Sequence, residues 1–252
     1  MKTLFSISFD AWLSKLTGRA AFNVCVDEAG QDLSSIVSQK LCGSDIIATL
    51  KLPASDITNS IAAQSIGFMH VETALSFQRD VATTQNVEKS LLRFARPDDK
   101  DAVVEIAKSS FVYTRFHMDP HVQNIHADLA KASWAGNYFS GQRGDAMIVA
   151  EWEGRVSGFL QLIFATDGNI IIDLIAVKRE AARQGLARKM IAMAMEHWSK
   201  NGASAFIRVG TQACNTASVN LYENMDFTLV GSQNIFHYHS AQHIENVASI
   251  NK

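Results

Sequence analysis

Two segments in the second half of the chain combine residue types that could bind an anion and move a proton. The first, IIDLIAVKREAARQGLARKM (residues 171–190), predicts a buried strand followed by a small-residue loop that opens a helix. Backbone N–H groups at a helix start are unpaired and carry the positive end of the helix dipole. Gly185 and Ala187 would let a diphosphate approach this turn, and Arg183 and Arg188 add charge. The same pattern also suits an ordinary capped helix.

The second segment is CNTASVNLYENMDF, residues 214–227, and it predicts an amphipathic helix. Asn215, Ser218 and Tyr222 are spaced by three and four residues, so they share one helical face. Beside them runs an apolar stripe that could pack on a sheet. Tyr222 is therefore either an amphipathic core residue or a group that takes part in chemistry.

Together the two segments resemble the GNAT superfamily of acyl-CoA N-acyltransferases. In that family a strand is followed by (Q/R)-x-x-G-x-(G/A), which corresponds here to residues 182–187. Later comes N-x-x-A-x-x-x-Y-x-x-x-G-F, which corresponds to residues 215–227. The segment RFARPDDKDAVVEIAKSSF is similar to the family's first strand and helix, so the resemblance covers roughly residues 91–239.

Three positions depart from the family pattern. Ala182 replaces the usual Gln or Arg, Ser218 replaces a small Ala, and Asp226 replaces Gly. The first departure could weaken the anchoring of the loop, although the diphosphate contacts that the resemblance implies come mostly from backbone N–H groups, which Ala182 retains. The other two departures concern local packing.

The resemblance implies that the chain uses acetyl-CoA as its co-substrate. The backbone of Leu174 and the following strand residues would lie beside the thioester, where it could support the oxyanion. The residues implied in cofactor binding are Ile175, Ala176, Val177, Arg183, Gln184, Gly185, Leu186, Ala187, Arg188 and Asn215.

Two catalytic residues follow from the same resemblance. Tyr222, with a reference pKa of about 10, could act as general acid toward the departing thiolate. Asp173 points to the opposite side of its strand from Leu174 and could accept the amine proton, directly or through water. Asp173 could equally pair with a nearby arginine or merely end an apolar run.

A polar segment, YTRFHMDPHVQNIH (residues 113–126), joins the first two predicted helices, where the family usually builds its acceptor pocket. The residues expected to bind the acceptor are Tyr113, Arg115, His117 and Asp119. A solvated connection is the alternative. His117 and His121 are four residues apart, but Pro120 would interrupt a helix that brought them together, so we expect no metal site.

The elements that must position these residues alternate between strands and helices. The chain after residue 90 reads β-α-α-β-β-β-α-β-α-β-β, which predicts an α/β (α+β) fold with a central mixed sheet. The last two strands are expected at residues 227–230 and 234–239, and His237 and His239 alternate on the second of them as packing residues. The polar stretch QRDVATTQNVEK predicts a linker, which gives an N-terminal domain over residues 1–88 and a catalytic domain over residues 89–252.

The N-terminal domain adds a second resemblance. Its end, LPASDITNSIAAQSIGFMHVETALSFQRD, predicts a helix, then Gly67-Phe68, then a strand, like the last third of a truncated GNAT fold. With the TRFHMDP segment, the whole chain is similar to the TDP-fucosamine acetyltransferase-like family, which acetylates nucleotide-linked 4-amino-6-deoxy sugars. The acceptor that this implies is a small-molecule amine on a nucleotide sugar. Another amine (an antibiotic, a polyamine or a protein N-terminus) and a non-catalytic CoA-binding module stay open.

The composition fits an enzyme acting on a small molecule. The chain has 252 residues, 47% of them hydrophobic, and 23 basic against 25 acidic residues, for a net charge of −2. This balance argues against a nucleic-acid partner, and no apolar run reaches the roughly 18–20 residues that span a bilayer. The three cysteines are scattered and predict reduced thiols in a cytoplasmic protein. A homodimer is left open.

Overall fold

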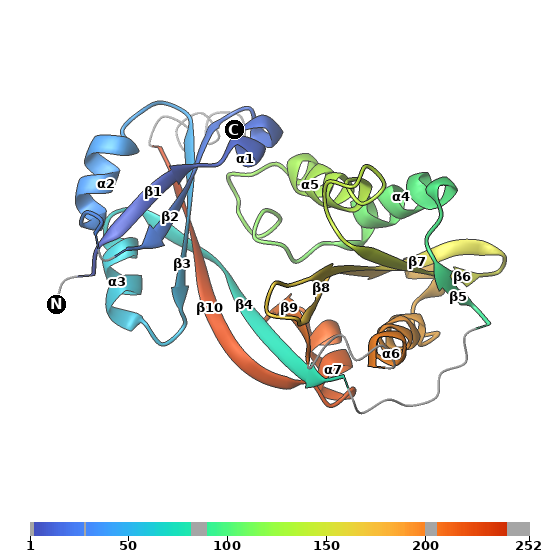
Figure 1. Cartoon of the computed structure of the whole chain (residues 1–252). Coiled ribbons are helices and arrows are strands. Elements are labelled where there is room, and N and C mark those ends of the chain that lie inside the picture. Colours follow the sequence, from blue (N-terminus) through green and yellow to red (C-terminus); the bar gives the residue numbers. More distant parts are fainter. Residues whose placement is uncertain (1–2, 28, 82–89, 200–205, 241–252) are drawn as a thin grey trace. The chain divides into compact units, whose positions relative to one another are not determined.

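The computed structural model describes residues 3–27, 29–81, 90–199 and 206–240, and the fold is given for these residues (Figure 1). They form two compact units, each assembled from separate parts of the chain. Unit 1 comprises Met1–Ala74, Tyr113–Ala127 and Ser232–Lys252, and unit 2 comprises Leu75–Val112 and Asp128–Gly231. The units differ from the predicted division after residue 88, because the last strand and the polar segment after residue 112 belong to the unit that holds the N-terminal elements.

Unit 1 alternates strands and helices from its first residues onward. Its elements are β1 (Phe5–Phe9), α1 (Ala11–Thr17), β2 (Ala20–Val26), α2 (Leu33–Lys40), β3 (Ile46–Pro53) and α3 (Ile57–Ser65). Three further elements pass from one unit into the other: β4 (Phe68–Asp80), α5 (Asn124–Gly136) and β10 (Thr228–His239). Each early helix begins at an aspartate, because the side chains of Asp10, Asp32 and Asp56 accept a hydrogen bond from the backbone N–H three residues on.

The sheet of unit 1 has the strand order β1-β2-β3-β10, followed by the first part of β4. Strands β2 and β3 are parallel, whereas β1–β2 and β3–β10 are antiparallel. One face is apolar and packs its core residues, among them Leu50 and Phe236, against α2 and α3. The opposite face is polar: Asn23 is the register partner of Thr49, and Thr49 is the register partner of His237.

Unit 2 holds the elements in which the two sequence motifs lie. They are β5 (Leu92–Phe94), α4 (Lys100–Ser110), β6 (Ala146–Trp152), β7 (Arg155–Phe164), β8 (Ile170–Val177), α6 (Leu186–Ser199), β9 (Phe206–Gln212) and α7 (Thr216–Glu223), with short 3₁₀ turns at Pro97–Asp99 and Arg179–Ala181. The last part of β4 leads into the strand order β9-β8-β7-β6-β5. Only β8 and β9 pair in parallel within that run.

Helices cover both faces of the unit 2 sheet (Figure 1). Alternate residues of β6 and β7 point to opposite faces, so Met147, Val149 and Phe159 pack toward α4 and α5. Their neighbours Ile148 and Leu160 pack toward α6 in a separate core cluster. This double covering explains why β6, β7 and β8 read as nearly continuous apolar runs in the sequence.

The mixed α/β sheet predicted from the sequence is confirmed, including the hairpin of β6 and β7 and the helices α4, α6 and α7. Two predicted elements were wrong in extent. The two last strands are one strand, β10, whose first half is exposed, and its polar residues had suggested a break. Residues 78–80 belong to β4 and not to a linker, because Gln78 and Arg79 find polar partners in unit 2.

Two other predictions fall on parts of the chain that are not described. The rest of the expected linker, residues 82–89, lies outside the described residues, as does Gly202, which was expected to end α6. Within the described part of the chain, none of the helices is long and apolar enough to cross a membrane.

Candidate active site

The parallel strands β8 and β9 of unit 2 separate after a short paired stretch. Their pairing covers Ile170–Ile207, Ile171–Arg208 and Ile172–Val209, although β8 continues to Val177 and β9 to Gln212. On its other edge β8 stays paired with β7 as far as Val177. After Ile172, the edge of β8 that faced β9 is therefore not paired with any described strand, and an extended ligand can add hydrogen bonds to the backbone groups there.

A β-bulge in β8 lies where the two strands separate. Gln161 pairs with Leu174 and Leu162 pairs with Ile172, so Asp173 is the extra residue without a partner on β7. The bulge changes which side chains face α6: Ile172 packs in the α6 cluster before it, and Ile175 packs against the same cluster after it. A simple alternation of side chains therefore does not hold through Asp173.

The carboxylate of Asp173 is surrounded by donors. Arg143 Nε and Nη2 donate to its two oxygens at 2.7 and 2.6 Å, and Gln161 Nε2 donates at 2.8 Å. The side chain of Asp173 is 9% exposed, and the Arg143 guanidinium lies over the Trp134 ring at 4.7 Å. Of the two alternatives left open for Asp173, the structure therefore shows the arginine partner, and its role as base stays a prediction.

Sequence reasoning missed Arg143, Gln161 and Trp134. The sequence nevertheless indicated that Asp173 has a partner, because a single carboxylate inside an apolar strand needs a cation or several hydrogen-bond donors once it is buried. Arg143 follows Gly141 and precedes Gly144, and both glycines have positive φ, which makes the tight loop that carries the guanidinium to the strand.

The turn after β8 has the backbone of an anion site. Arg183 and Gly185 have positive φ values of 63° and 73°, and α6 begins at Leu186. The first helical hydrogen bond recorded from this turn runs from Lys189 N to Gly185 O at 2.9 Å, so the N–H groups of residues 186–188 precede the helical ladder. Arg183, Gln184 and Gly185 are exposed, Ala187 is half-buried and Leu186 is buried in the core.

Two other predicted cofactor residues have partners within unit 2. Asn215 is the N-cap of α7, and its side chain accepts a hydrogen bond from Ser218 N at 3.2 Å. The exposed Arg188 donates to the carbonyl oxygen of Asn224, at the end of the same helix, at 2.7 Å. These contacts account for the two side chains structurally, and their contact with the cofactor stays a prediction.

Tyr222 lies in the apolar core of unit 2. Its side chain is nearly fully buried, and its ring packs against Phe77 and Phe227 with centroid distances of 5.8 and 5.6 Å. Burial raises the pKa of Tyr222 well above its ordinary value. The hydroxyl therefore keeps its proton at neutral pH, which a proton donor requires.

The segment that was predicted to bind the acceptor belongs to unit 1, and its four predicted residues differ in exposure. Tyr113 is exposed, whereas Arg115 and His117 are half-buried. His117 Nδ1 shares a hydrogen bond of 2.7 Å with Thr114 Oγ1, and the Arg115 guanidinium lies over the ring of Phe116 at 4.6 Å. Arg115 Nε is buried without a hydrogen-bond partner among the described residues.

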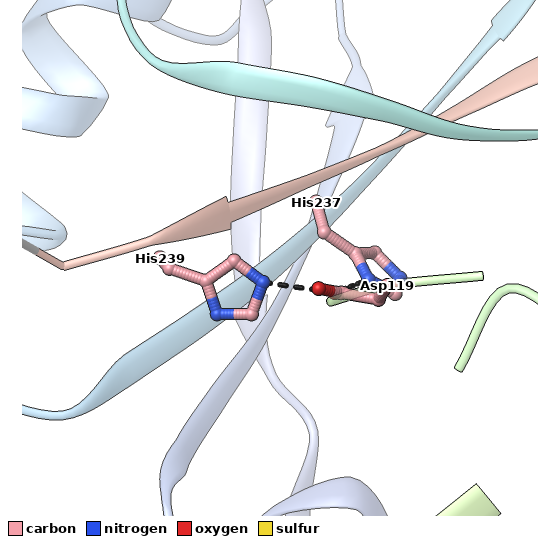
Figure 2. A group of neighbouring side chains, drawn as sticks. All are labelled: Asp119, His237 and His239. Carbon is pink, nitrogen blue, oxygen red and sulfur yellow. Dashed lines mark hydrogen bonds and ion pairs between the residues drawn. The ribbon is translucent and has the colours of Figure 1, made fainter. Parts of the chain in front are cut away.

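Asp119 is buried in unit 1 and is bound by the two histidines of β10 (Figure 2). His237 Nδ1 and His239 Nε2 both contact its Oδ2, at 2.5 and 2.8 Å, and His121 N donates to its Oδ1 at 2.9 Å. Both histidines were expected to be packing residues, and neither contact was foreseen. Among the described residues this trio forms the group whose side-chain types and spacing could suit a metal ion, whereas His117 and His121 do not form one.

Charge in this trio is set by opposing influences. Burial alone would raise the pKa of Asp119, but hydrogen bonds from His237 and His239 outweigh it and hold the pKa well below its usual range. Burial lowers the pKa of each histidine, and the attraction of Asp119 offsets this only in part. The arrangement therefore favours an ionised carboxylate with two neutral imidazoles.

A family comparison agrees with these features of unit 2. The model of the acetyltransferase (GNAT) family matches residues 101–227, which is half of the chain. The chain therefore belongs to this family, as the two motifs had indicated.

The chain is also similar to individual proteins and solved structures. The chain is 33% identical over 143 residues to the spore coat polysaccharide biosynthesis protein SpsD of Bacillus subtilis (strain 168), a match covering 57% of this chain. That match spans only 48% of the length of SpsD. Among solved structures, a GCN5-related N-acetyltransferase from Sphaerobacter thermophilus aligns with a TM-score of 0.62 at 10% identity, covering 94% of this chain and 76% of that one.

A tandem GNAT protein from the clavulanic acid biosynthesis pathway is also similar. It aligns with a TM-score of 0.55 at 12% identity, covering 86% of this chain and 75% of that one. At such low identity these structures show the fold alone. Their alignments reach well beyond the residues that the family model matches, so the fold that these structures share with this chain includes elements of unit 1.

Proposed function

We propose that this protein transfers the acetyl group of acetyl-CoA to the amine of a nucleotide-linked 4-amino-6-deoxy sugar. The observation that carries the transfer is the separation of β8 and β9 directly before the positive-φ turn of α6. The sugar-nucleotide acceptor is supported by the resemblance of the whole chain and by the similarity to a protein whose name places it in polysaccharide biosynthesis.

The strand edge and the turn suit the two ends of the acyl donor. The diphosphate would take the N–H groups of the turn, with the exposed Arg183 adding charge. The pantetheine arm is an extended chain with amide groups, and the unpaired edge of residues 173–177 offers amide partners along one line. Backbone N–H groups at this edge could also bind the oxyanion that forms when the amine attacks the thioester.

Proton movement needs one donor and one acceptor. The amine attacks the thioester carbonyl, the C–S bond breaks, and the thiolate that leaves takes a proton. Tyr222 keeps its hydroxyl proton in its apolar surroundings, and it is the proposed donor. Asp173 is the proposed acceptor, directly or through water, and its oxygens are held in place by Arg143 and Gln161.

The acceptor residues proposed in unit 1 are Tyr113, Arg115 and His117. A half-buried guanidinium with an unpartnered Nε suits a phosphate oxygen, and the exposed ring of Tyr113 suits a base or sugar face. Asp119 is proposed to contribute by positioning the side chains next to it, because its own carboxylate is buried inside the protein.

The test is a thiol-release assay with acetyl-CoA and a panel of amines. The panel contains nucleotide-linked 4-amino-6-deoxy sugars, the same sugars without the nucleotide, an aminoglycoside, a polyamine and a peptide with a free N-terminus. We expect release with the nucleotide-linked sugars, and a product that mass spectrometry shows to be acetylated on nitrogen. Release with only another amine would overturn the acceptor class, and CoA binding without release from any amine would favour the non-catalytic module.

A further inference from the structure

The bulge at Asp173 lies at the point where β8 leaves β9. The last paired residues of the two strands are Ile172 and Val209, and the bulge is the next residue of β8. A bulge bends its strand and increases the local twist, so it turns the residues that follow away from the neighbouring strand. The shape of the unpaired edge of β8 therefore depends on how Asp173 is held.

Two side chains hold Asp173 from different elements of unit 2. Gln161 belongs to β7, where it pairs with Leu174, and its amide nitrogen donates to Asp173 Oδ2 at 2.8 Å. Arg143 belongs to the loop before β6, and its Nε and Nη2 donate to the two carboxylate oxygens at 2.7 and 2.6 Å. The two-pronged guanidinium matches a carboxylate in one orientation, so Arg143 fixes the direction of the Asp173 side chain and also balances its charge.

The loop that carries Arg143 is itself held against β7. At its end, Asp145 N donates to Leu162 O at 2.8 Å. Gly144 has a φ of +87°, and a Cβ at this position would lie only 2.9 Å from the side chain of Gln161. The loop therefore packs directly on the second residue that holds the bulge, and Arg143 extends from a backbone that is fixed to the sheet.

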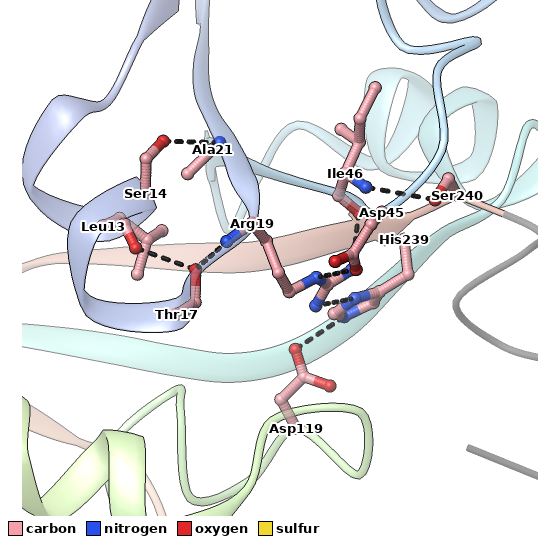
Figure 3. A network of polar contacts seen from close by, with 10 residues as sticks. All are labelled: Leu13, Ser14, Thr17, Arg19, Ala21, Asp45, Ile46, Asp119, His239 and Ser240. Carbon is pink, nitrogen blue, oxygen red and sulfur yellow. Dashed lines mark hydrogen bonds and ion pairs between the residues drawn. The ribbon is translucent and has the colours of Figure 1, made fainter. Parts of the chain in front are cut away.

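Arg19 of unit 1 holds its surroundings in a different way (Figure 3). Its Nη2 donates to the carbonyl oxygen of Ile46 at 2.7 Å, and its Nη1 lies 3.0 Å from His239 Nδ1. Arg19 therefore binds the backbone of a strand directly. Among the described residues, the side chain of Arg143 has no carbonyl partner, so its hydrogen bonds reach β8 only through the carboxylate of Asp173.

We propose that Arg143 is a positioning residue for acetyl-CoA. By fixing Asp173 it holds the bulge, and the bulge keeps the edge of β8 turned away from β9 and open to the cofactor. This proposal rests on the proposed function, because it takes the unpaired edge as the place where acetyl-CoA binds. When the guanidinium is lost, the bulge loosens and the backbone groups of residues 174–177 shift together, although Arg143 does not touch the reacting atoms.

The binding test compares Arg143→Gln with wild type by calorimetry with acetyl-CoA. We expect the Kd to rise about tenfold or more, because the charge-assisted hydrogen bonds that fix the bulge are lost. Arg143→Lys keeps the charge but not the two-pronged geometry, so it should recover part of the affinity. Arg155→Gln is the matched control and should bind like wild type, because Arg155 is an exposed arginine at the start of β7 in the same unit.

Kinetics with the panel amine that gives the fastest thiol release separate positioning from other roles. Arg143→Gln should raise KM for acetyl-CoA and lower kcat by up to about 10²-fold, because a displaced edge misplaces the thioester. KM for the acceptor and the acidic limb of the pH–rate profile should keep their wild-type values. A rise in KM for the acceptor alone, or a displaced acidic limb with unchanged acetyl-CoA affinity, would overturn the proposal and assign Arg143 to the acceptor or to proton transfer.

A double variant keeps the test valid if Arg143→Gln, which leaves Asp173 without its cation, fails to fold. Arg143→Gln with Asp173→Asn removes both charges, and urea unfolding checks its stability. Because the two side chains act through one contact, the double variant should bind acetyl-CoA no more weakly than either single variant. Additive losses, or wild-type affinity in every variant, would overturn the proposal. If wild type binds acetyl-CoA but releases no thiol with any amine, the proposed function fails, and the affinities still decide the role of Arg143.

Discussion

The two units each bury a carboxylate, but they neutralise it in different ways. In unit 2, Asp173 accepts hydrogen bonds from two of the guanidinium nitrogens of Arg143 and from the amide of Gln161, so its charge is balanced by a permanent cation. In unit 1, Asp119 binds His237 and His239, whose burial favours their neutral forms. Both carboxylates are well satisfied, yet only the histidine partner leaves a nitrogen whose lone pair is unused.

The kind of partner decides whether a buried carboxylate lies beside a permanent charge or beside a group that can take up a proton. An arginine partner stays protonated at every relevant pH, so Arg143 gives Asp173 a permanent opposite charge beside the bulge of β8. A histidine partner can gain a proton and lose it again, although burial lowers the pKa of these two rings below its ordinary value. The trio in unit 1 therefore keeps a nitrogen that can take up a proton, whereas the oxygens of Asp173 in unit 2 are bound by donors.

The largest expected effect concerns the donor. Tyr222→Phe keeps the ring that packs on Phe77 and Phe227 and removes only the hydroxyl. Turnover should fall about 10²–10⁴-fold while acetyl-CoA affinity, measured by calorimetry, stays near that of wild type. Phe227→Leu serves as a control for changes in packing alone. Wild-type turnover in Tyr222→Phe, under conditions where chemistry limits the rate, would show that Tyr222 is only a core residue.

The next prediction separates the two carboxylates. Asp173→Asn leaves Arg143 without its anion, and we expect a loss of stability of about 1–3 kcal/mol in urea unfolding. If Asp173 only fixes the strand, the acidic limb of the pH–rate profile should keep its wild-type position. A displaced or missing acidic limb would instead support Asp173 as the base.

The smallest expected effect is a pH dependence of stability that comes from unit 1. In the unfolded chain each histidine titrates near a pKa of about 6.5, whereas burial lowers the pKa of His237 and His239 in the folded protein. As the pH falls below about 6.5, the unfolded state binds protons that the native state does not, so stability decreases. The depressed pKa of Asp119 adds a further loss below about pH 4.

The slope that this produces is at most about 1.4 kcal/mol per pH unit for each histidine. Urea midpoints measured between pH 8 and pH 5 should decline, and His237→Gln should flatten the decline. A midpoint that does not change over this range would mean that the two rings bind protons equally in the native and unfolded states, and a midpoint that rises toward pH 5 would mean that the native state binds more of them.

The sequence predicted the turn and the helix of unit 2 better than the side-chain contacts of unit 1, and the reason is the distance between partners along the chain. The turn of residues 182–188 and the helix of Tyr222 are local patterns, in which spacing alone indicates the geometry. The trio of Asp119, His237 and His239 joins residues that are 118 and 120 positions apart. Only the pairing of β10 with β3 and the course of the 113–127 segment bring them together.

Two further differences have similar physical causes. The lone carboxylate of Asp173 in an apolar strand indicated that a cation lies nearby. The sequence did not show which cation, because Arg143 lies 30 residues from Asp173. Strand β10 was predicted as two strands because Gly231 and the polar residues after it resemble a turn. Its first half is exposed, where polar residues are tolerated in a continuous strand.

The most direct test of the account measures both Michaelis constants in Gly185→Val and Arg115→Ala. Gly185 has a φ of +73° with open space around it, so valine brings backbone strain of about 1–2 kcal/mol at the turn. Gly154→Val is its control, because Gly154 has the same φ and is equally open but lies in the β6–β7 hairpin.

The account predicts that Gly185→Val raises KM for acetyl-CoA about 5–30-fold and leaves KM for the acceptor unchanged. Arg115→Ala should do the reverse, raising KM for the nucleotide-linked sugar about tenfold or more. Gly154→Val should change neither constant. If both variants changed the same constant, or if Gly154→Val weakened acetyl-CoA as much as Gly185→Val, the division between a cofactor site in unit 2 and an acceptor site in unit 1 would be contradicted.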